Sequence, residues 1–383
     1  MGCNRSYRAR LGLIVAIVAV VCLLPVRMAF ARAEDGTLAW IWSPHDGQPA
    51  LTQPGQSFEV LLRGTSAPTE IPVFTLEGTD GAEFPLETKI HGMEQSAFAR
   101  YTCVVPATAR PGGYALRIRG TDGTTDITRR AVWVLDAEPR AYYVLAHVTD
   151  VHIGKQRPAG PDPDTTFSAV IEAISKTDAA LCAITGDITE SAEPDQFRRF
   201  LELLDRFTIP TLVCSGNHDR DNLWYERFWG AQTWARRYGP DGFLVFDTKD
   251  YVVADDWGPQ AGRLHQLRRL LRPCRYTIGL THRYEPAMGM RGQLILFVDD
   301  PIDLLLYGHT HQERRPGEGP SWGNTGIVIT PACVDGYFRL IDITAQGPVA
   351  RPVSRIPEDA LITRHSDEKK ITGRNILLVL KPL

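Results

Sequence analysis

From about residue 140 onward, apolar strand-like runs alternate along the chain with helical patterns, and few folds accommodate that alternation. The helical pattern "FSAVIEAISK" precedes the apolar run "ALCAIT", and "PDQFRRFLELLDRF" precedes "TLVCS". Helix-then-strand alternation is typical of crossover units around a sheet that is buried on both faces. The sequence therefore predicts an α/β domain, and in such domains ligands gather where the strands end at their carboxyl side.

Each of these strand-like runs ends in polar side chains. Five of the ten histidines in the chain stand at such positions, together with carboxylates and one amide. A single histidine there would be explained by a turn or core position, but a whole set at the carboxyl end of one parallel sheet indicates a shared site. The residues are Asp150, His152, Asp187, Asn217, His218, Asp219, His282, His309 and His311.

The chemistry of this set indicates metal binding. Asp150 with His152, and His309 with His311, are two residues apart, and in extended backbone that spacing places both side chains on one side. Mixed oxygen and nitrogen ligands without cysteine suit Mn, Fe, Zn or a similar divalent ion. Without His218 and Asp219, the set contains seven candidate ligands, which are too many for one such ion and suit two ions that share a carboxylate. Two ions so placed favour in-line phosphoryl displacement.

Five motifs, in order, carry a resemblance to a known family. "TDVH", "GD", "GNHD", a later "TH" and "GHTH" lie between residues 140 and 343. Together they resemble the calcineurin-like metallophosphoesterase superfamily, which implies a β-sandwich core flanked by helices and a metal-dependent phosphoric ester hydrolase. His152 in the first motif, and the lack of a tyrosine soon after Asp187, differ from purple acid phosphatases. In these two features the sequence resembles instead the branch of the superfamily that contains cyclic-nucleotide phosphodiesterase-like and sphingomyelinase-like enzymes.

The resemblance also implies which residues bind two divalent transition-metal ions, Mn, Fe or Zn. Asp187 would bridge the ions. The other ligands divide into two sets of three: Asp150, His152 and His311 for the first ion, and Asn217, His282 and His309 for the second.

Within "GNHD", the resemblance implies that His218 binds no metal and acts as a general acid, while Asp219 orients its ring. A metal-bridging hydroxide would attack the phosphorus of a small-molecule or lipid phosphoester, with phosphodiesters favoured over monoesters. The glycine before Asn217 would let the chain turn sharply. Arg220, Trp224, Tyr225, Arg283 and Tyr284 either line the substrate pocket or belong to the core and the solvated surface.

Residues 35–138 have a different pattern, with short alternating segments separated by Gly, Pro, Asp and Thr. This spacing predicts an antiparallel, immunoglobulin-like β-sandwich. His45 and His91 are expected at its surface, and the sandwich is expected to be dispensable for chemistry because every candidate ligand follows it. It could contact a partner or a polymer. The phosphoesterase domain is expected at 140–345, and residues 346–383 form an extension without an assignment.

The first 33 residues predict a cleaved signal peptide. They contain five arginines in all and no acid. A basic start with three of the arginines is followed by an apolar run from Leu11 to Leu24 and an A-x-A site at Ala31 to Ala33. The mature chain would begin near Glu34 and be secreted or periplasmic, without a stable membrane span. The alternative is an uncleaved N-terminal anchor, which the short apolar run and Pro25 disfavour.

The mature chain would retain 37 basic and 45 acidic side chains, a net charge of −8. No basic run remains to follow a phosphate backbone, which argues against nucleic acid as a partner. Its five cysteines have no C-x-x-C spacing and imply no disulfide framework. The remaining functional alternatives are a phosphomonoesterase of the same fold and a non-catalytic envelope binding protein. The second would be favoured by a broken ligand set, whereas this set is complete.

Overall fold

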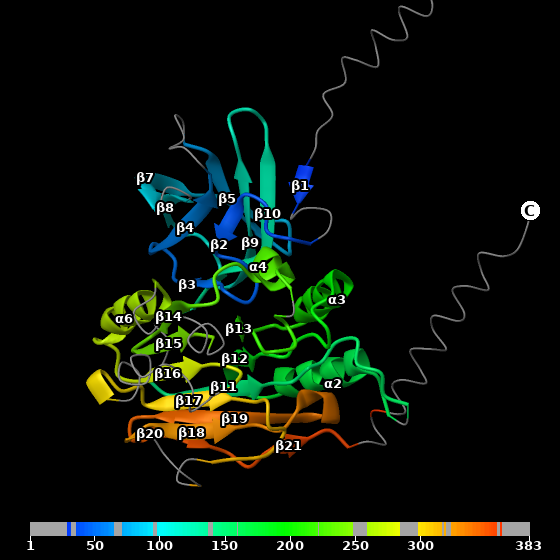
Figure 1. Ribbon diagram of the computed structural model, residues 1–383. Helices are drawn as coiled ribbons and strands as arrows, with labels where there is room; N and C mark the ends of the chain where they lie inside the picture. The colour runs from blue at the N-terminus through cyan, green and yellow to red at the C-terminus, as the bar shows by residue number, and fades with distance from the viewer. Residues whose placement is uncertain are drawn as a thin grey trace, which may run out of the picture.

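A computed structural model describes most of the chain in two parts (Figure 1). The described residues are 29–31, 36–64, 71–94, 98–136, 141–158, 160–220, 222–247, 259–283, 298–315, 318, 323–357 and 361. Most of the predicted signal peptide, Tyr284 and the end of the predicted extension lie outside them. Within the described part, no helix combines the length and the apolar character needed to cross a membrane.

The N-terminal part is a β-sandwich, with two sheets that enclose one core. Its strand pairs are antiparallel, as predicted, except that residues 29–31 and 50–52 run parallel to their partner strand, and residues 29–31 lie before the predicted start of the domain. In β4 (Ser57–Arg63) and β8 (Phe98–Val104) every second residue is buried, so each strand turns one face inward. The core includes Val60, Phe74, Tyr101 and Leu116 from both sheets. One sheet has the order β1 (Ala29–Ala31), β10 (Thr125–Val134), β9 (Gly112–Arg119), β5 (Val73–Gly78) and β6 (Glu83–Pro85), with β3 (Ala50–Thr52) also paired to β10. The other has the order β2 (Ile41–Ser43), β4 (Ser57–Arg63), β8 (Phe98–Val104) and β7 (Glu87–Glu94).

The expectation for one histidine of the sandwich is wrong. His91 is exposed as predicted, but His45 is only 1% exposed. The His45 ring lies 6.2 Å from that of Trp229, which belongs to the C-terminal part. His45 is buried because the two parts of the chain meet there.

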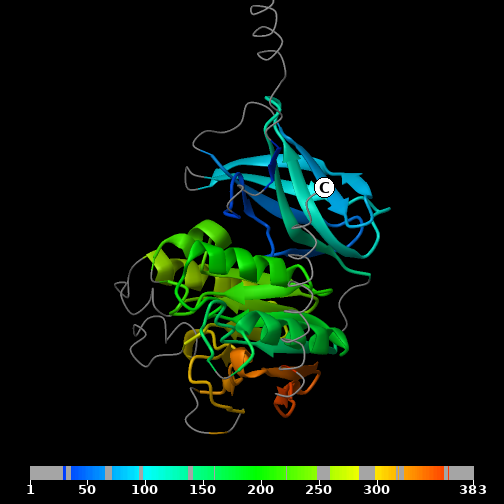
Figure 2. The same cartoon turned by 90° about the vertical axis from the view of Figure 1, so that its right-hand side faces the viewer.

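The C-terminal part is a second β-sandwich with helices on both outer faces (Figures 1 and 2). Side chains of both sheets, such as Leu145 and Leu306, share one core. The first sheet has the order β13 (Thr211–Cys214), β12 (Ala179–Thr185), β11 (Tyr143–Val148), β19 (Tyr337–Thr344) and β20 (Gly347–Ala350), with β21 (Ser354–Arg355) paired to β19. The second has the order β14 (Trp234–Tyr238), β15 (Asp241–Val245), β16 (Thr277–Leu280), β17 (Leu304–Tyr307) and β18 (Gly326–Ile329).

This architecture confirms the metallophosphoesterase-like fold but corrects the expectation of a single parallel sheet. Strands β11 to β13 are parallel to one another, and so are β15 to β18, in two separate sheets. The strands β20 and β21 fall in the segment that the sequence left without an assignment, and both pair with β19.

The helices cover the sandwich because each presents an apolar face. Helix α3 (Pro194–Leu204) begins with a proline at its first position and buries Phe197, Phe200 and Leu204, whose spacings of three and four residues define one helical face. These side chains pack against the first sheet beside residues of three other elements. Those elements are α2 (Pro163–Ser175), α4 (Trp224–Trp229) and the short 3₁₀ helix η2 (Cys333–Asp335). Helix α6 (Pro259–Leu271) covers the second sheet.

Candidate metal centre

The predicted site residues all follow the carboxyl ends of strands, and the structure brings these ends together. Three of the loops come from the first sheet, after β11, β12 and β13, and two come from the second, after β16 and β17. The two sheets face each other across one core, so their strand ends meet at one edge of the sandwich. The site therefore draws on both sheets of the sandwich, whereas the strand pattern alone placed it at the edge of one parallel sheet.

Among the described residues, three groups of three side chains form there, and two of them consist only of proposed ligands. The third contains His152, Glu190 and His218, and so shares His152 with the first. Asp150, His152 and His311 place one potential ligand atom each within 4.8 Å of one another, and so do Asp187, His282 and His309. The clusters adjoin, because His152 Nε2 lies 3.8 Å from Asp150 Oδ1 and 3.9 Å from Asp187 Oδ2. Such spacing fits two ions that share ligands better than two separate sites.

Hydrogen bonds on the outer side of the clusters fix which atom of each ligand faces inward. His152 Nδ1 bonds to the Glu190 carboxylate at 2.7 Å, and His282 Nδ1 bonds to the Thr185 carbonyl at 2.8 Å. Both rings therefore present Nε2 to the interior. Asp150 Oδ2 accepts hydrogen bonds from the Thr149 hydroxyl and the His309 backbone N–H, which leaves Oδ1 facing inward.

The inward-facing atoms are suited to a metal because they are buried and several of them form no hydrogen bond. Among the described residues, three such atoms form no hydrogen bond: Asp150 Oδ1, His152 Nε2 and His282 Nε2. Asn217 Oδ1, in the loop after β13, is also buried without a hydrogen bond. His282 Nε2 lies 3.0 Å from Asp187 Oδ2 without the alignment of a hydrogen bond. Buried polar atoms rarely stay unpaired. Their convergence, with nitrogen and oxygen donors, fits divalent transition metals.

The charges of the site are consistent with that chemistry. Burial acts to raise the pKa of Asp187, but His282 and other neighbours outweigh it and lower the pKa to about 2. Burial acts to lower the pKa of His282, but the adjacent Asp187 and Asp150 raise it to about 9. The Asp187 carboxylate is thus ionised at neutral pH, and a bound metal would displace a proton from His282.

The backbone of the ligands is unusual and corrects the argument from extended spacing. Five of the seven proposed ligands have positive φ angles, in the left-handed region that non-glycine residues seldom occupy. They are Asp150 (55°), His152 (53°), Asp187 (47°), His309 (65°) and His311 (55°). Asp150 and His152 do share one cluster, but His309 and His311 belong to different clusters, so the prediction that each pair converges on one centre is wrong for the second pair. Tight loops rather than extended backbone position these side chains. Such strain is concentrated at functional sites, where the surrounding structure enforces it.

A close approach explains the glycine of "GNHD". Gly216 lies so close to Asp187 that an added Cβ would overlap with the Asp187 backbone nitrogen and carboxylate. The predicted reason, a sharp turn that needs glycine's conformational freedom, does not apply, because Gly216 does not have a positive φ. The glycine is required because the turn that contains Asn217 packs directly against the proposed bridging ligand.

His218 lies beside the clusters with one ring nitrogen held. Its Nδ1 bonds to the Glu190 carbonyl oxygen at 2.7 Å, and its ring centroid is 4.9 Å from that of His152. A carbonyl only accepts hydrogen bonds, so Nδ1 carries the proton and Nε2 is left for a substrate. The His218 backbone N–H donates to Asp187 Oδ1 at 2.9 Å, which ties the residue to the proposed bridge.

Asp219 has a different role from the predicted one. Its carboxylate accepts hydrogen bonds from the backbone N–H groups of Ile188, Thr189 and Gly216 and from the Thr189 hydroxyl. These bonds join the loop after β12 to the loop after β13. Burial raises the pKa of Asp219 to about 6. In the structure, the Glu190 carbonyl orients the His218 ring, and Asp219 connects the two loops.

Glu190 is the residue that the motif analysis missed. Its carboxylate holds His152 and its backbone carbonyl holds His218, so one residue contacts a proposed ligand and the proposed acid. The only signal in the sequence is its position three residues after Asp187 in "GDITE". A carboxylate behind a metal-binding histidine fixes the ring and raises its basicity.

We expect Glu190→Gln to weaken metal binding by ~10–100-fold, the usual cost of losing a carboxylate behind a histidine ligand. The backbone carbonyl remains, so the orientation of His218 should change little, and kcat at saturating metal should stay close to normal. Titration with Mn²⁺ beside rates at excess Mn²⁺ would measure both. Glu193→Gln is the matched control, because it removes the same charge from an exposed position three residues further on. Equal metal affinity in the two variants would contradict the role of Glu190.

The alternatives left open for the substrate pocket are partly resolved. Tyr225 is only 1% exposed and belongs to the core under the first sheet, so the core interpretation holds for it. Arg220 forms an ion pair with Asp247, which also accepts a hydrogen bond from Ser215. Arg283 lies close enough to His309 to contribute, with burial and His282, to the lowered pKa of that histidine.

Comparisons with known proteins agree with this site. The family described as Calcineurin-like phosphoesterase matches residues 143–313. A curated relative, the 3',5'-cyclic adenosine monophosphate phosphodiesterase CpdA of Haemophilus influenzae, is 24% identical over 265 residues, which cover 58% of this chain and 94% of the relative.

Two solved structures are also similar in part. The purple acid phosphatase PPD1 from yellow lupin (Lupinus luteus) seeds has a TM-score of 0.48 and 15% identity, over 76% of this chain and 68% of its own. A structure of PhoD has a TM-score of 0.46 and 9% identity, over 87% of this chain and 90% of its own.

Fold, site and family match together define a metal-dependent phosphoester hydrolase. Residues 143–313 of the chain form a domain of the calcineurin-like metallophosphoesterase superfamily.

Proposed function

We propose that the chain is an exported hydrolase that prefers phosphodiesters over monoesters and works with two divalent metal ions. The observation that carries the proposal is the pair of adjoining clusters whose buried inward-facing atoms lack hydrogen bonds. When bound, two such ions supply neutralisation of phosphoryl charge and an acidified water. We assign the ligands as the family resemblance implies: Asp150, His152 and His311 to the first ion, Asn217, His282 and His309 to the second, and Asp187 to both.

His218 supplies the proton for the leaving group. With Nδ1–H donating to the Glu190 carbonyl, the protonated ring directs Nε2–H toward the substrate. A proton delivered to the departing oxygen lowers the barrier to breaking the P–O bond. The neighbouring Asp219 keeps the two loops of the site in register through its four hydrogen bonds.

The preference for diesters is supported by the relative named as a 3',5'-cyclic adenosine monophosphate phosphodiesterase, because the match covers 94% of that relative. His152 in the first motif supports the same branch of the family. A monoesterase of the same fold would use the same ligands and the same acid, so only substrate selectivity separates the two functions.

Rates on bis-p-nitrophenyl phosphate and p-nitrophenyl phosphate, in chelator-treated protein reloaded with Mn²⁺, test the proposal. We expect activity that depends on Mn²⁺ and a higher kcat/KM on the diester. A higher kcat/KM on the monoester would contradict the proposed preference for diesters and would identify the protein as a phosphomonoesterase. Protein that binds two Mn²⁺ ions and hydrolyses neither compound would instead support a non-catalytic envelope binding protein.

Export is supported by the first 33 residues, with their arginines, apolar run and A-x-A site. We propose a mature chain that starts near Glu34, with the sandwich at 35–138 and the phosphoesterase domain from residue 140. Intact-mass measurement of protein recovered from outside the cytoplasm would test the cleavage. Retention of residues 1–33 in that protein would establish the anchor instead.

A further inference from the structure

We propose that the N-terminal sandwich is a working part of the phosphoesterase: the segment around Gly47 contacts both ends of the stretch that carries Asn217 and His218, and so positions that stretch. The inference rests on the proposed function for the roles of Asn217 and His218. It replaces the expectation that the sandwich is dispensable for chemistry.

The first contact is at the strand that leads into the site. Strand β13 is at the edge of the first sheet, with β12 on one side. On its other side Gly47 forms a parallel bridge to Leu212, and Val213 N–H donates to the Gly47 carbonyl at 2.9 Å. An edge strand exposes unpaired backbone groups unless another segment covers it. A residue of the sandwich thus covers this edge four residues before Asn217.

The second contact is at the helix that follows the site. Gly47 has a φ of 90°, and a Cβ added there would lie 2.7 Å from Cζ3 of Trp229, the last residue of α4. The His45 ring packs on the same indole, and the Leu38 N–H donates to the Arg227 carbonyl at 2.7 Å. Both Val213, before Asn217 and His218, and Trp229, after them, therefore contact Gly47.

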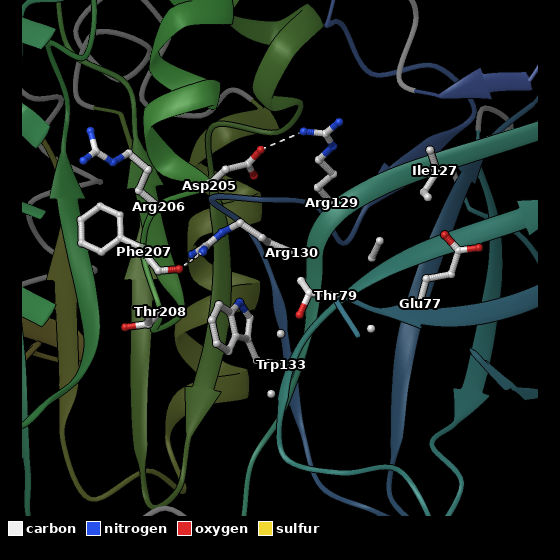
Figure 3. A pocket seen from close by; sticks show the side chains of 14 residues that line it. Glu77, Thr79, Ile127, Arg129, Arg130, Trp133, Asp205, Arg206, Phe207 and Thr208 are labelled. Atoms are coloured by element: carbon white, nitrogen blue, oxygen red, sulfur yellow. Dashed lines mark hydrogen bonds and ion pairs between the residues drawn. The ribbon is translucent and has the colours of Figure 1, made fainter. Parts of the chain in front are cut away.

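Two arginines extend the contact across both sheets of the phosphoesterase. Arg130 of β10 donates to the Phe207 and Ile209 carbonyls in the loop that enters β13, and its guanidinium stands 5.0 Å above the Trp133 ring (Figure 3). Its φ of 49° places it among the few strained non-glycine residues. Arg236 of β14 donates to the Pro49 carbonyl at 2.8 Å.

The junction is not packed throughout. A cavity of about 670 Å³ lies between the sandwich and the loop after α3, with Arg130 and Trp133 in its lining (Figure 3). It borders the segment that leads into β13, up to Thr208, whereas Asn217 follows the end of that strand, and no proposed ligand lines the cavity. The contacts of Gly47 and Arg130 are therefore specific connections across an incompletely filled junction.

A pair of glycine variants tests the inference. Gly55 also has a positive φ, 80°, but an added Cβ there would meet nothing within 4 Å. Alanine costs backbone strain at both positions, and only at position 47 does it also push on Trp229. We expect both variants to lower Tm by roughly 2–4 °C. Gly47→Ala alone should weaken the binding of one of the two Mn²⁺ ions and lower kcat, each by about tenfold or more.

Stepwise Mn²⁺ titration, kcat and KM, and thermal unfolding would be measured on the full chain. If Gly47→Ala binds two Mn²⁺ ions and turns over as Gly55→Ala does, the sandwich only adds stability and the inference is overturned. Should Gly47→Ala fail to fold, Arg130→Met against Arg119→Met, at the exposed end of β9, makes the same comparison. There only Arg130→Met should lose affinity for one ion, and equal affinities would overturn the inference.

Failure of the proposed function would be seen separately, in the unaltered protein. A wild-type chain without Mn²⁺-dependent hydrolysis refutes the phosphoesterase assignment. A wild-type chain with full activity, beside variants at Gly47 and Arg130 with unchanged metal affinity and kcat, refutes only the positioning role of the sandwich.

Discussion

His218→Gln should lower kcat by ~10²–10⁴, the contribution of a positioned proton donor, while both metal ions stay bound. The ring belongs to neither three-residue cluster of proposed ligands around Asp150 and Asp187, and its Nδ1 is already held by the Glu190 carbonyl. Glutamine can still donate a hydrogen bond but cannot transfer a proton. Metal analysis and rates on the same preparation would measure both quantities.

The loss should depend on the leaving group. A nitrophenolate departs readily without a proton, so His218→Gln should slow an aryl ester least. An alkoxide is poorly stabilised and needs the proton as the bond breaks, so an alkyl ester should be slowed most. Equal slowing of both esters, or loss of a metal ion from the variant, would show that His218 is not the acid.

Asp219→Asn is an informative comparison for His218→Gln. Because the Asp219 carboxylate bonds to the loops and His218 bonds to Glu190, the Asn variant should lower Tm and metal affinity without the leaving-group dependence. If Asp219→Asn showed the same leaving-group trend as His218→Gln, the result would instead support the prediction that the Asp219 side chain orients the His218 ring.

Replacing Asp187 should have the largest effect on the metal centre itself. Its Oδ2 lies 3.0 Å from His282 Nε2 and 3.9 Å from His152 Nε2, so one carboxylate serves both clusters. Asp187→Asn removes the shared charge and turns an amide N–H₂ group toward donors or toward the metals. We expect both ions to be lost at micromolar Mn²⁺ and the rate to fall by ~10³-fold or more, toward the uncatalysed reaction.

Elemental analysis after gel filtration, with rates across a range of Mn²⁺ concentrations, would measure this loss. Asp195→Asn is the matched control, since it removes the same charge from an exposed residue at the start of α3. Retention of both ions in Asp187→Asn, with only the rate reduced, would remove Asp187 from its place as the bridge.

The proposed ligands could be found from sequence because each stands directly after a strand-like run, where local pattern and chemistry coincide. Asp187 and His282, for instance, follow β12 and β16 and face each other across two sheets. The pattern of strands alone does not reveal two sheets, because parallel runs read alike whether they share a sheet or not, and only the family resemblance implied the β-sandwich core. The meeting of the sheets is set by packing between residues far apart in the chain, such as Leu145 and Leu306.

The supporting residues were harder to predict because their roles are set by long-range contacts. Glu190 acts through a carboxylate bond to His152, 38 residues away, and through a backbone carbonyl that has no sequence signature. Asp219 follows His218 directly, yet its side chain bonds to backbone N–H groups of another loop. His45 is buried by Trp229, which belongs to the other part of the chain.

The left-handed backbone of the ligands has a consequence for any mutational study of this site. Aspartate, asparagine and histidine tolerate that conformation better than other non-glycine residues, so the residue types that bind metal also suit the loops. Alanine at Asp150 or His309 would therefore disturb the loop as well as remove the ligand atom. An alanine scan would overstate the contribution of each metal bond, whereas asparagine keeps the backbone preference, so that Asp150→Asn reports on the lost charge and His309→Asn on the lost imidazole.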